Sequence, residues 1–277
     1  MRIVVTGLSG NLGTALLRRL ATTHQHEVVG IVRRPPSGGE PYEAASWVAL
    51  DLADGSAESG LRRAFTGADA VVHLAWEFQP SHDVDYMDRG TVGGTAAVLS
   101  AADAAGVAHL VHLSSLGVYS PAPRAVSDGT PARVDEDYPR DGISSLSYSR
   151  EKVAAERLLD DYEAVPATGH RVAITRIRPG IVMQRDAASA ILRYTTPPWL
   201  PSRVLRHVPV LPLDRSLTFP GVHADDVAAA LVVVLEQRAT GAFTWPPSRR
   251  SPPRTWPRRW APGSCTCRCH WCAAQRR

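Results

Sequence analysis

A glycine-rich turn near the start of the chain constrains the fold more than any other feature. Residues 2–7 read RIVVTG, a short apolar strand, and the segment then continues as LSGNLG, so that Gly7, Gly10 and Gly13 are spaced three apart. Glycines at this spacing let the backbone turn tightly and approach a pyrophosphate, which then lies at the N-terminus of the next helix. Because the turn joins a strand to a helix-like segment, it predicts a dinucleotide-binding site rather than a plain tight turn.

Strand-like and helix-like segments alternate after this turn. The strand-like segments are 26–34, 69–75, 107–115 and 171–182, and the helix-like segments are 11–23, 59–68, 91–106 and 147–164. Such alternation predicts a parallel sheet covered by helices on both faces. With right-handed crossovers, the fold class is α/β, a Rossmann-type doubly wound parallel sheet.

The composition of the sequence changes after Pro179. Residues 195–216 are rich in proline and arginine, which is typical of loops and short elements, and residues 221–237 form a helix-like segment with Asp225 and Asp226 near its start. We therefore expect a Rossmann domain at 1–178, a small C-terminal substrate lobe at 179–240 that is interleaved with the core, and a separate tail at 241–277.

The tail differs from the body in every compositional respect. From Gly241 it has eight arginines, four tryptophans and no acidic residue, and all four cysteines lie in CTCRCHWC at Cys265–Cys272. A metal site needs better separated ligand pairs, and a disordered tail contains few aromatics, so neither interpretation fits well. Read in another frame with GC-rich codons, residues 244–272 become a helix and strand pattern. We expect a frameshift near Thr244, which makes 241–277 non-native and mostly disordered; no metal is expected.

Charge and hydropathy narrow the classes of partner and location. The chain carries a net charge of +4 and the tail holds eight unopposed arginines, so the first 240 residues carry −4 and offer no basic surface for nucleic acid. The longest apolar run, from Val227, is far below the ~18 residues that span a bilayer. The sequence starts directly with a strand instead of a charged leader and an apolar segment, so we expect no membrane association and a cytoplasmic location.

Two arginines follow the second strand-like segment. An NAD site usually places an acidic residue there for the ribose hydroxyl, whereas this chain has Arg33 and Arg34. Since a guanidinium suits a 2′-phosphate, the pair favours NADP over NAD, the alternative being that both arginines are merely solvated.

The chain contains a single lysine among 31 basic residues, Lys152, and it lies four residues after Tyr148 on a helix-like segment. At this spacing the two side chains share one helix face. A phenol has a pKa of about 10, so it needs a nearby cation to act as an acid or base near neutrality. The pair predicts such a site, although an exposed helix surface also contains this spacing often.

Taken together, the ordered motifs resemble those of the extended short-chain dehydrogenase/reductase superfamily, specifically the NAD(P)-dependent epimerase/dehydratase family. The resemblance runs from Met1 to about Phe243 through TGLSGNLG at Thr6, DL at Asp51, HLA at His73, GT at Gly94, LSSLGVY at Leu113, Tyr148 with Lys152, RPG at Arg178 and HADDVA at His223.

The resemblance implies specific roles for residues of these motifs. Tyr148 would be the acid/base, Ser115 the catalytic serine, and Lys152 would hold the nicotinamide ribose and lower the pKa of Tyr148. Thr91 stands where the family usually has an asparagine that holds a water or fixes the helix geometry, and Trp76 replaces a small residue, either narrowing the pocket or filling the core. Cofactor contacts are expected from Gly7, Ser9, Gly10, Asn11, Leu12, Gly13, Arg33, Arg34, Asp51, Leu52, His73, Leu74, Ala75, Ser114, Tyr148, Lys152, Arg178 and Pro179.

The resemblance also implies the type of reaction. We expect hydride transfer at a secondary alcohol or ketone carbon of a small-molecule substrate, with a nucleotide sugar as the family default. The alternatives are a reductase of non-sugar ketones or aldehydes, and a regulator that binds NAD(P) without turnover, although such relatives usually lose the Tyr148–Lys152 type of pair. A homodimer through the helices that carry Tyr148 and Thr91 is a further expectation, with Val153, Leu158 and Leu159 as an apolar surface that serves either the dimer or the sheet.

Overall fold

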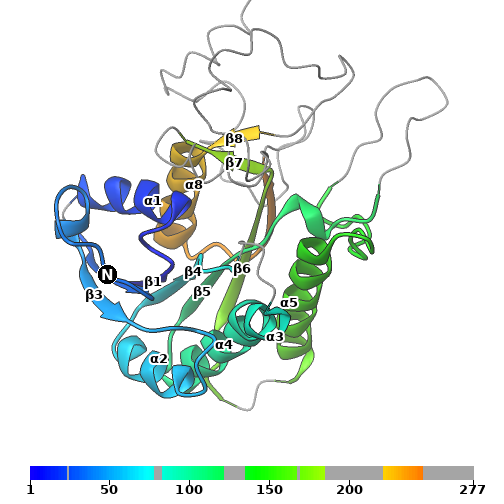
Figure 1. Ribbon diagram of the computed structural model, residues 1–277, viewed down its shortest axis with the longest axis horizontal. Coiled ribbons are helices and arrows are strands. Elements are labelled where there is room, and N and C mark those ends of the chain that lie inside the picture. Colours follow the sequence, from blue (N-terminus) through cyan, green and yellow to red (C-terminus); the bar gives the residue numbers. More distant parts are fainter. Residues whose placement is uncertain (24, 78–82, 122–134, 167–168, 185–220, 246–277) are drawn as a thin grey trace, which may run out of the picture.

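The computed structural model describes residues 1–23, 25–77, 83–121, 135–166, 169–184 and 221–245. These residues form a seven-stranded sheet in the order β3-β2-β1-β4-β5-β6-β9, in which every neighbouring pair is parallel (Figure 1). The strands are β1 (Arg2–Thr6), β2 (Glu27–Val32), β3 (Ser46–Ala49), β4 (Ala70–His73), β5 (His109–Leu113), β6 (Ala173–Pro179) and β9 (Gly241–Trp245). The predicted Rossmann-type parallel sheet is confirmed.

Helices cover both faces of this sheet, as the alternating pattern predicted. On one face α1 (Asn11–Ala21) packs beside α8 (Ala224–Gln237), and the opposite face carries α2 (Ala57–Phe65), α4 (Gly94–Ala104) and α5 (Ser147–Ala164) (Figure 1). None of the helices in the described ranges has the length and apolar character needed to cross a membrane.

Each face of the sheet has its own apolar core. In β1, Ile3 and Val5 pack into the layer under α1 and α8, whereas Val4 points into the layer under α2 and α4, and all three are fully buried. Burying an aliphatic side chain of this size contributes about 1.5–3 kcal/mol, so strands that are apolar on both faces are stable only inside such a three-layer fold.

The C-terminal elements of the described residues lie partly in the core and partly in a small second sheet. Helix α8 lies in the layer beside α1 and so completes the nucleotide-binding core. Two strands after Pro179, β7 (Ile181–Met183) and β8 (Gly221–His223), form a parallel sheet that is separate from the main sheet (Figure 1). The remainder of the expected lobe, residues 185–220, lies outside the described residues.

The first five residues of the expected tail form strand β9. It pairs with β6 along its length, and Phe243 is 2% exposed among the core side chains. The core therefore includes β9 up to Trp245, and the expected division between lobe and tail stays a prediction. The rest of the proposed frameshifted segment, with the cysteine run at 265–272, lies outside the described residues.

The helical segment predicted from Thr91 begins earlier than expected. Helix α3 (Val84–Asp88), a π-helical turn at Arg89–Gly93 and α4 follow one another without a break. Such turns widen a helix by one residue and are frequent at functional sites.

Candidate functional site

The predicted site residues gather at one edge of the main sheet. The strands are parallel, so their carboxyl ends meet there, and the strand order reverses between β1 and β4. The glycine-rich turn follows β1, the motif at His73 ends β4, and the serine pair follows β5. Sheets of this class bind their ligands in the crevice at this switch point.

At Gly7 and Gly13 of the turn a side chain would collide with backbone, and at Gly10 it would make a tight contact. Gly7 has φ +73°, and a Cβ there would lie 2.8 Å from the Ala75 Cα. A Cβ on Gly13 would lie 2.4 Å from the Leu8 carbonyl oxygen, and one on Gly10 would lie 3.1 Å from the Gly7 carbonyl oxygen. Helix α1 starts at Asn11 without an acidic residue in its first turn. The turn thus fits the pyrophosphate of a dinucleotide, with free backbone amides of α1 facing it.

The other residues expected in this turn play different parts. Ser9 is exposed at the turn, and Leu12 is buried in the core under α1. The side-chain amide of Asn11 donates to the Val182 carbonyl at 3.0 Å, and the Gln184 amide donates to the Asn11 carbonyl at 2.6 Å. These bonds tie the start of α1 to β7, so Asn11 supports the turn as well as lying in it.

The adenosine end of the crevice contains a polar cluster around Asp51. One Asp51 oxygen accepts from the Ala53 amide at 2.9 Å, and the other accepts from the Tyr86 hydroxyl at 2.7 Å. Arg33 donates to that hydroxyl at 3.0 Å and lies 3.2 Å from the Glu77 carboxylate. Two carboxylates therefore already face Arg33, which weakens its suitability for a 2′-phosphate.

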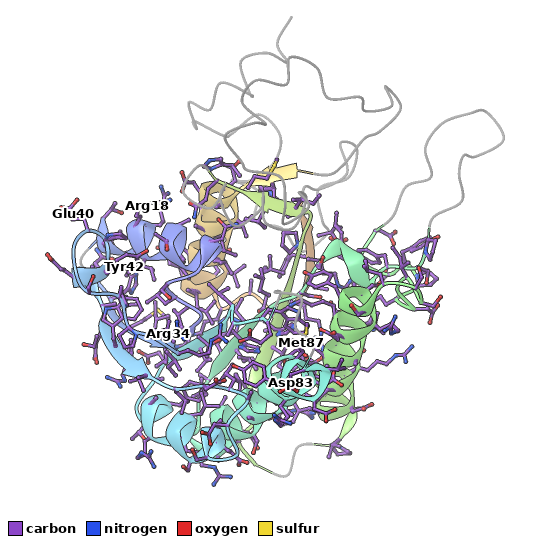
Figure 2. All side chains as sticks on the ribbon, in the orientation of Figure 1. Arg18, Arg34, Glu40, Tyr42, Asp83 and Met87 are labelled. Atoms are coloured by element: carbon purple, nitrogen blue, oxygen red, sulfur yellow. The ribbon has the colours of Figure 1, made fainter. Side chains whose placement is uncertain are left out.

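Arg34 is the other arginine predicted to contact the cofactor. Its side chain is exposed at the end of β2 (labelled in Figure 2). Leu52, expected beside the adenine, is half-buried, and a Cβ on Gly94 would lie 3.2 Å from its Cβ. The polar cluster around Asp51 combines four separate segments of the chain, those of Arg33, Asp51, Glu77 and Tyr86.

The HLA motif ends β4 next to the glycine-rich turn. His73 is buried between two hydroxyls, with Nδ1 2.7 Å from the Thr6 Oγ1 and Nε2 3.2 Å from the Thr95 Oγ1. Burial lowers the pKa of His73 to about 3, and the charge of Lys152 adds to this effect. His73 is therefore a neutral structural link, whereas Leu74 and Ala75 lie against the turn at Gly7.

Tyr148 and Ser115 meet as the family resemblance implied. They are linked by a side-chain hydrogen bond, and Ser115 also accepts from the Gly117 amide at 3.0 Å at the start of the short 3-10 turn Leu116–Val118. Burial raises the pKa of Tyr148 above its usual value, and the bond with Ser115 acts against this rise. The phenol is thus protonated at neutral pH in the cofactor-free protein.

Lys152 lies one helical turn after Tyr148, but its ammonium faces other groups. It is 3% exposed, donates to the Leu113 carbonyl at 2.8 Å and lies 3.3 Å from the centre of the Trp76 ring. Burial lowers its pKa well below the usual value, while the charges of Glu156 and Glu151 oppose this shift. The expected lowering of the pKa of Tyr148 by Lys152 is not found in this arrangement, because the ammonium is 5.9 Å from the phenol ring centre and bound to Leu113.

Trp76 packs directly in this site. Its ring meets that of Tyr148 edge to face at a centroid distance of 6.3 Å and that of His112 at 6.5 Å, while its face covers Lys152. Trp76 thus belongs to the cluster of Tyr148, Lys152 and His112. Its indole Nε1 is buried without a partner among the described residues.

The hydroxyl of Thr91 donates within its own helical segment. It is fully buried, and the hydroxyl donates to the carbonyl of Met87, a residue labelled in Figure 2, at 2.9 Å. Its carbonyl accepts from the Thr95 hydroxyl, which also contacts His73. Thr91 therefore stabilises the π-helical turn, and the alternative role of the family's asparagine, fixing the helix geometry, describes it better than a relay.

Ser114 and Arg178 share a partner on α5, and their expected contact with the cofactor stays a prediction. Both donate to the buried carboxylate of Glu156, Ser114 at 2.5 Å and Arg178 through two nitrogens at 2.8 and 2.6 Å. The physical reason is charge: the guanidinium of Arg178 is 2% exposed and needs a carboxylate partner. Pro179 is buried at the end of β6, beside β9.

Several residues of the site have no role in the sequence analysis. Tyr86, Glu77, His112 and Glu156 act through partners far away in sequence, so no local spacing indicates them. Only Glu156 had a usable signal, since it continues the spacing of four that joins Tyr148 to Lys152.

The model of the NAD dependent epimerase/dehydratase family matches residues 3–243. The chain belongs to this family. As a member of it, the chain has NAD(P)-dependent oxidoreductases and epimerases as its homologues, in agreement with the crevice and the Tyr148–Ser115 pair.

Similar proteins differ in how much of their length this chain covers. An uncharacterised protein of Mycobacterium tuberculosis is 40% identical over 115 residues, which are 42% of this chain and only 12% of that protein. L-arabinose 1-dehydrogenase (NAD(P)(+)) of Haloferax volcanii is 31% identical over 212 residues, 72% of this chain and 77% of the enzyme. The crystal structure of UDP-glucose 4-epimerase of Thermus thermophilus with NAD has a TM-score of 0.65 at 24% identity, covering 88% of this chain and 77% of that one.

Proposed function

We propose that this family member transfers a hydride between a bound nicotinamide and a carbon that bears a hydroxyl or keto group, with Tyr148 moving the proton. The observation that carries the proposal is the hydrogen-bonded pair of the half-buried Tyr148 and Ser115, of which Ser115 follows β5 at the same edge of the sheet as the glycine-rich turn after β1. A phenol in this position serves as a general acid or base at the reacting oxygen.

Each residue of the pair has a defined task. When bound, the nicotinamide accepts or supplies the hydride. Ser115 orients the phenol and donates to the substrate oxygen, and Tyr148 holds the proton that this oxygen gains or loses. Because burial raises the pKa of Tyr148, the cofactor-free protein holds that proton at neutral pH, which suits reduction of a ketone. Oxidation of an alcohol needs the phenolate and accelerates as the pH rises.

Lys152 is proposed to support this pair through its charge. Its ammonium lies under the Trp76 ring and donates to the Leu113 carbonyl, and it is the group that would hold the nicotinamide ribose. A compact ammonium fits between Trp76 and the Leu113 carbonyl, whereas a guanidinium is larger and planar, which accounts for the single lysine of the chain at this place.

We propose a sugar or sugar derivative as the substrate class and NAD(P) as the cofactor. The 31% identical relative is named as a dehydrogenase of L-arabinose that uses NAD(P)(+), and its alignment spans most of both chains. Preference for NADP now depends on Arg34, since Arg33 is engaged by Glu77 and Tyr86. The nucleotide-sugar substrate and the cytoplasmic location stay predictions.

The dimer expectation changes in its details. Val153 is 5% exposed and Leu159 is fully buried, so both pack inside the molecule. Of the three residues proposed as an apolar dimer surface, Leu158 is half-buried and still available for contact. It lines a groove between α2, α4 and α5. A homodimer through α4 and α5 stays a prediction, tested by light scattering at micromolar concentration.

Turnover with a panel of substrates tests the proposed function. The panel holds free aldoses, uronates, nucleotide sugars and simple ketones, each with NAD and NADP in their matching redox states. Stoichiometric change in the reduced cofactor with a sugar is the expected result. The protein used must have an ordered 114–118 segment. If such protein binds the cofactor but converts no substrate of the panel, the result would support the alternative of a regulator that binds NAD(P) without turnover and would contradict the proposal.

A further inference from the structure

Helix α5 holds the loop that carries Ser115 through three side chains of one face. The Ser149 hydroxyl donates to the Gly117 carbonyl at 2.5 Å, the Lys152 ammonium donates to the Leu113 carbonyl, and Glu156 accepts from the Ser114 hydroxyl. The loop is thus bound to the helix at Leu113 and Ser114, which precede Ser115, and at Gly117, which follows it. Glu156 stands one helical turn beyond Lys152 and two turns beyond Tyr148.

Glu156 is the most constrained of these three groups. It is 1% exposed, and its two oxygens accept four hydrogen bonds, from Ser114, from two nitrogens of Arg178 and from Arg140 at 2.8 Å. A carboxylate has about four acceptor positions, so every one of them is used. Its position is therefore fixed from β6, from the segment before α5 and from the loop after β5.

The same cluster reaches the last strand of the sheet. Arg178 donates to the Tyr119 hydroxyl at 2.9 Å, and that hydroxyl lies 2.7 Å from the Thr244 Oγ1. The Thr244 amide donates to the Glu136 side chain at 2.9 Å. Both ends of the 114–119 loop thus connect to one buried ion pair, which joins α5 to β6, and the Tyr119 hydroxyl links this pair to Thr244 of β9.

We infer that Glu156 is a positioning residue, which through Ser114 holds Ser115 at the distance that its hydrogen bond with Tyr148 requires. A hydrogen bond to a buried charged group is strong and short, so Ser114 and the next residue have little freedom. The role in turnover rests on the proposed function, whereas the role in holding the loop does not.

Ser114→Ala tests the inference without unbalancing a charge. It removes one of four bonds to Glu156 and leaves both arginines in place. The matched control is Ser100→Ala, since Ser100 also donates to a glutamate, Glu58, at 2.9 Å, but on the exposed surface of α4. Ser115→Ala, which removes the bond to Tyr148 itself, provides the positive reference.

Backbone hydrogen exchange measures the loop directly, with no substrate. Gly117 and Val118 donate to Ser115, so their amides report its position. We expect their exchange to rise about tenfold or more in Ser114→Ala, which corresponds to loss of one such bond, with no change in Ser100→Ala or at β1. Unchanged exchange at these amides in Ser114→Ala would overturn the inference.

Kinetic measurements then distinguish a loss of positioning at Ser115 from a general destabilisation of the protein. Normalised to cofactor-binding sites, kcat of Ser114→Ala should fall about 10- to 10²-fold while the Kd of the cofactor stays within about twofold. Looser exchange with unchanged kcat would also overturn the inference. If the wild type turns over no substrate, the proposed function fails, and the exchange result still decides whether Glu156 holds the loop.

Discussion

The two ends of the crevice are built on opposite principles. At the cofactor end, the glycine-rich turn works by the absence of side chains, since a Cβ at Gly7 or Gly13 would collide with backbone. At the catalytic end, Tyr148 and Ser115 rest on buried polar side chains that are satisfied by partners on other elements. The first end depends on the backbone path of one turn, and the second depends on side chains from several elements.

The catalytic end should therefore lose far more stability from a single change. Glu156→Gln leaves Arg178 buried beside a neutral group, and breaking a buried pair in this way costs about 3–5 kcal/mol of unfolding free energy. Chemical denaturation of this variant and of Glu58→Gln, which breaks an exposed pair with Arg62, measures the difference. Equal small losses would show that the buried pair of Glu156 and Arg178 contributes no more to stability than an exposed pair.

The cofactor end should respond to an added methyl group with a smaller loss. Gly13→Ala places a Cβ against the Leu8 carbonyl, and overpacking of this kind costs about 1–3 kcal/mol. Because the turn must shift, the Kd of NAD(P) should rise by at least about tenfold, whereas Gly55→Ala, where a Cβ meets nothing within 4 Å, should leave it unchanged. Isothermal titration measures both, and an unaltered Kd in Gly13→Ala would contradict the account of the turn.

Mild acid should lower the free energy of unfolding through two buried histidines. Burial lowers the pKa of His73 to about 3 and that of His112 well below its usual value, so the unfolded chain binds more protons below about pH 6.5. Stability should fall as the pH drops below this value, by up to about 1.4 kcal/mol per pH unit for each histidine.

Glu156 adds a second effect at lower pH. Burial alone would raise its pKa, but the bonds and charge of Arg178 outweigh this and bring it below 4.5, so its stabilisation is lost only as the pH falls below that value. Unfolding curves between pH 7 and 4 test both effects. A flat profile from pH 6.5 to 5 would show that the histidines are not buried as neutral groups.

The smallest expected effect concerns the exposed arginine of the adenosine end. Arg34→Ala should weaken NADPH binding up to about fivefold, the range for an exposed charge contact, and leave NADH unchanged. Arg33→Ala should alter the two cofactors alike, because Arg33 is paired with Glu77. A selective loss of NADPH in Arg33→Ala alone would reverse these assignments.

The same contrast explains what the sequence predicts well. The strand-turn-helix at Gly7–Gly13 and the spacing of Tyr148 and Lys152 are local patterns, so the parallel sheet and the position of the pair could be predicted. The contacts of Ser114 and Arg178 could not, because they depend on Glu156, which is 42 residues from the first and 22 from the second. Strand β9 was not predicted because its five residues pair with β6, a strand far away in sequence, and because the arginine- and proline-rich tail follows it directly.

Proton transfer by Tyr148 is the central claim, and Tyr148→Phe tests it most directly. The matched control is Tyr162→Phe on the same helix, whose hydroxyl bonds Asp103 at 2.6 Å away from the crevice. With a substrate that the wild type turns over, kcat of Tyr148→Phe should fall by about 10²-fold or more, with the cofactor Kd within about twofold and the control near wild type. Turnover by Tyr148→Phe at the wild-type rate would contradict the account.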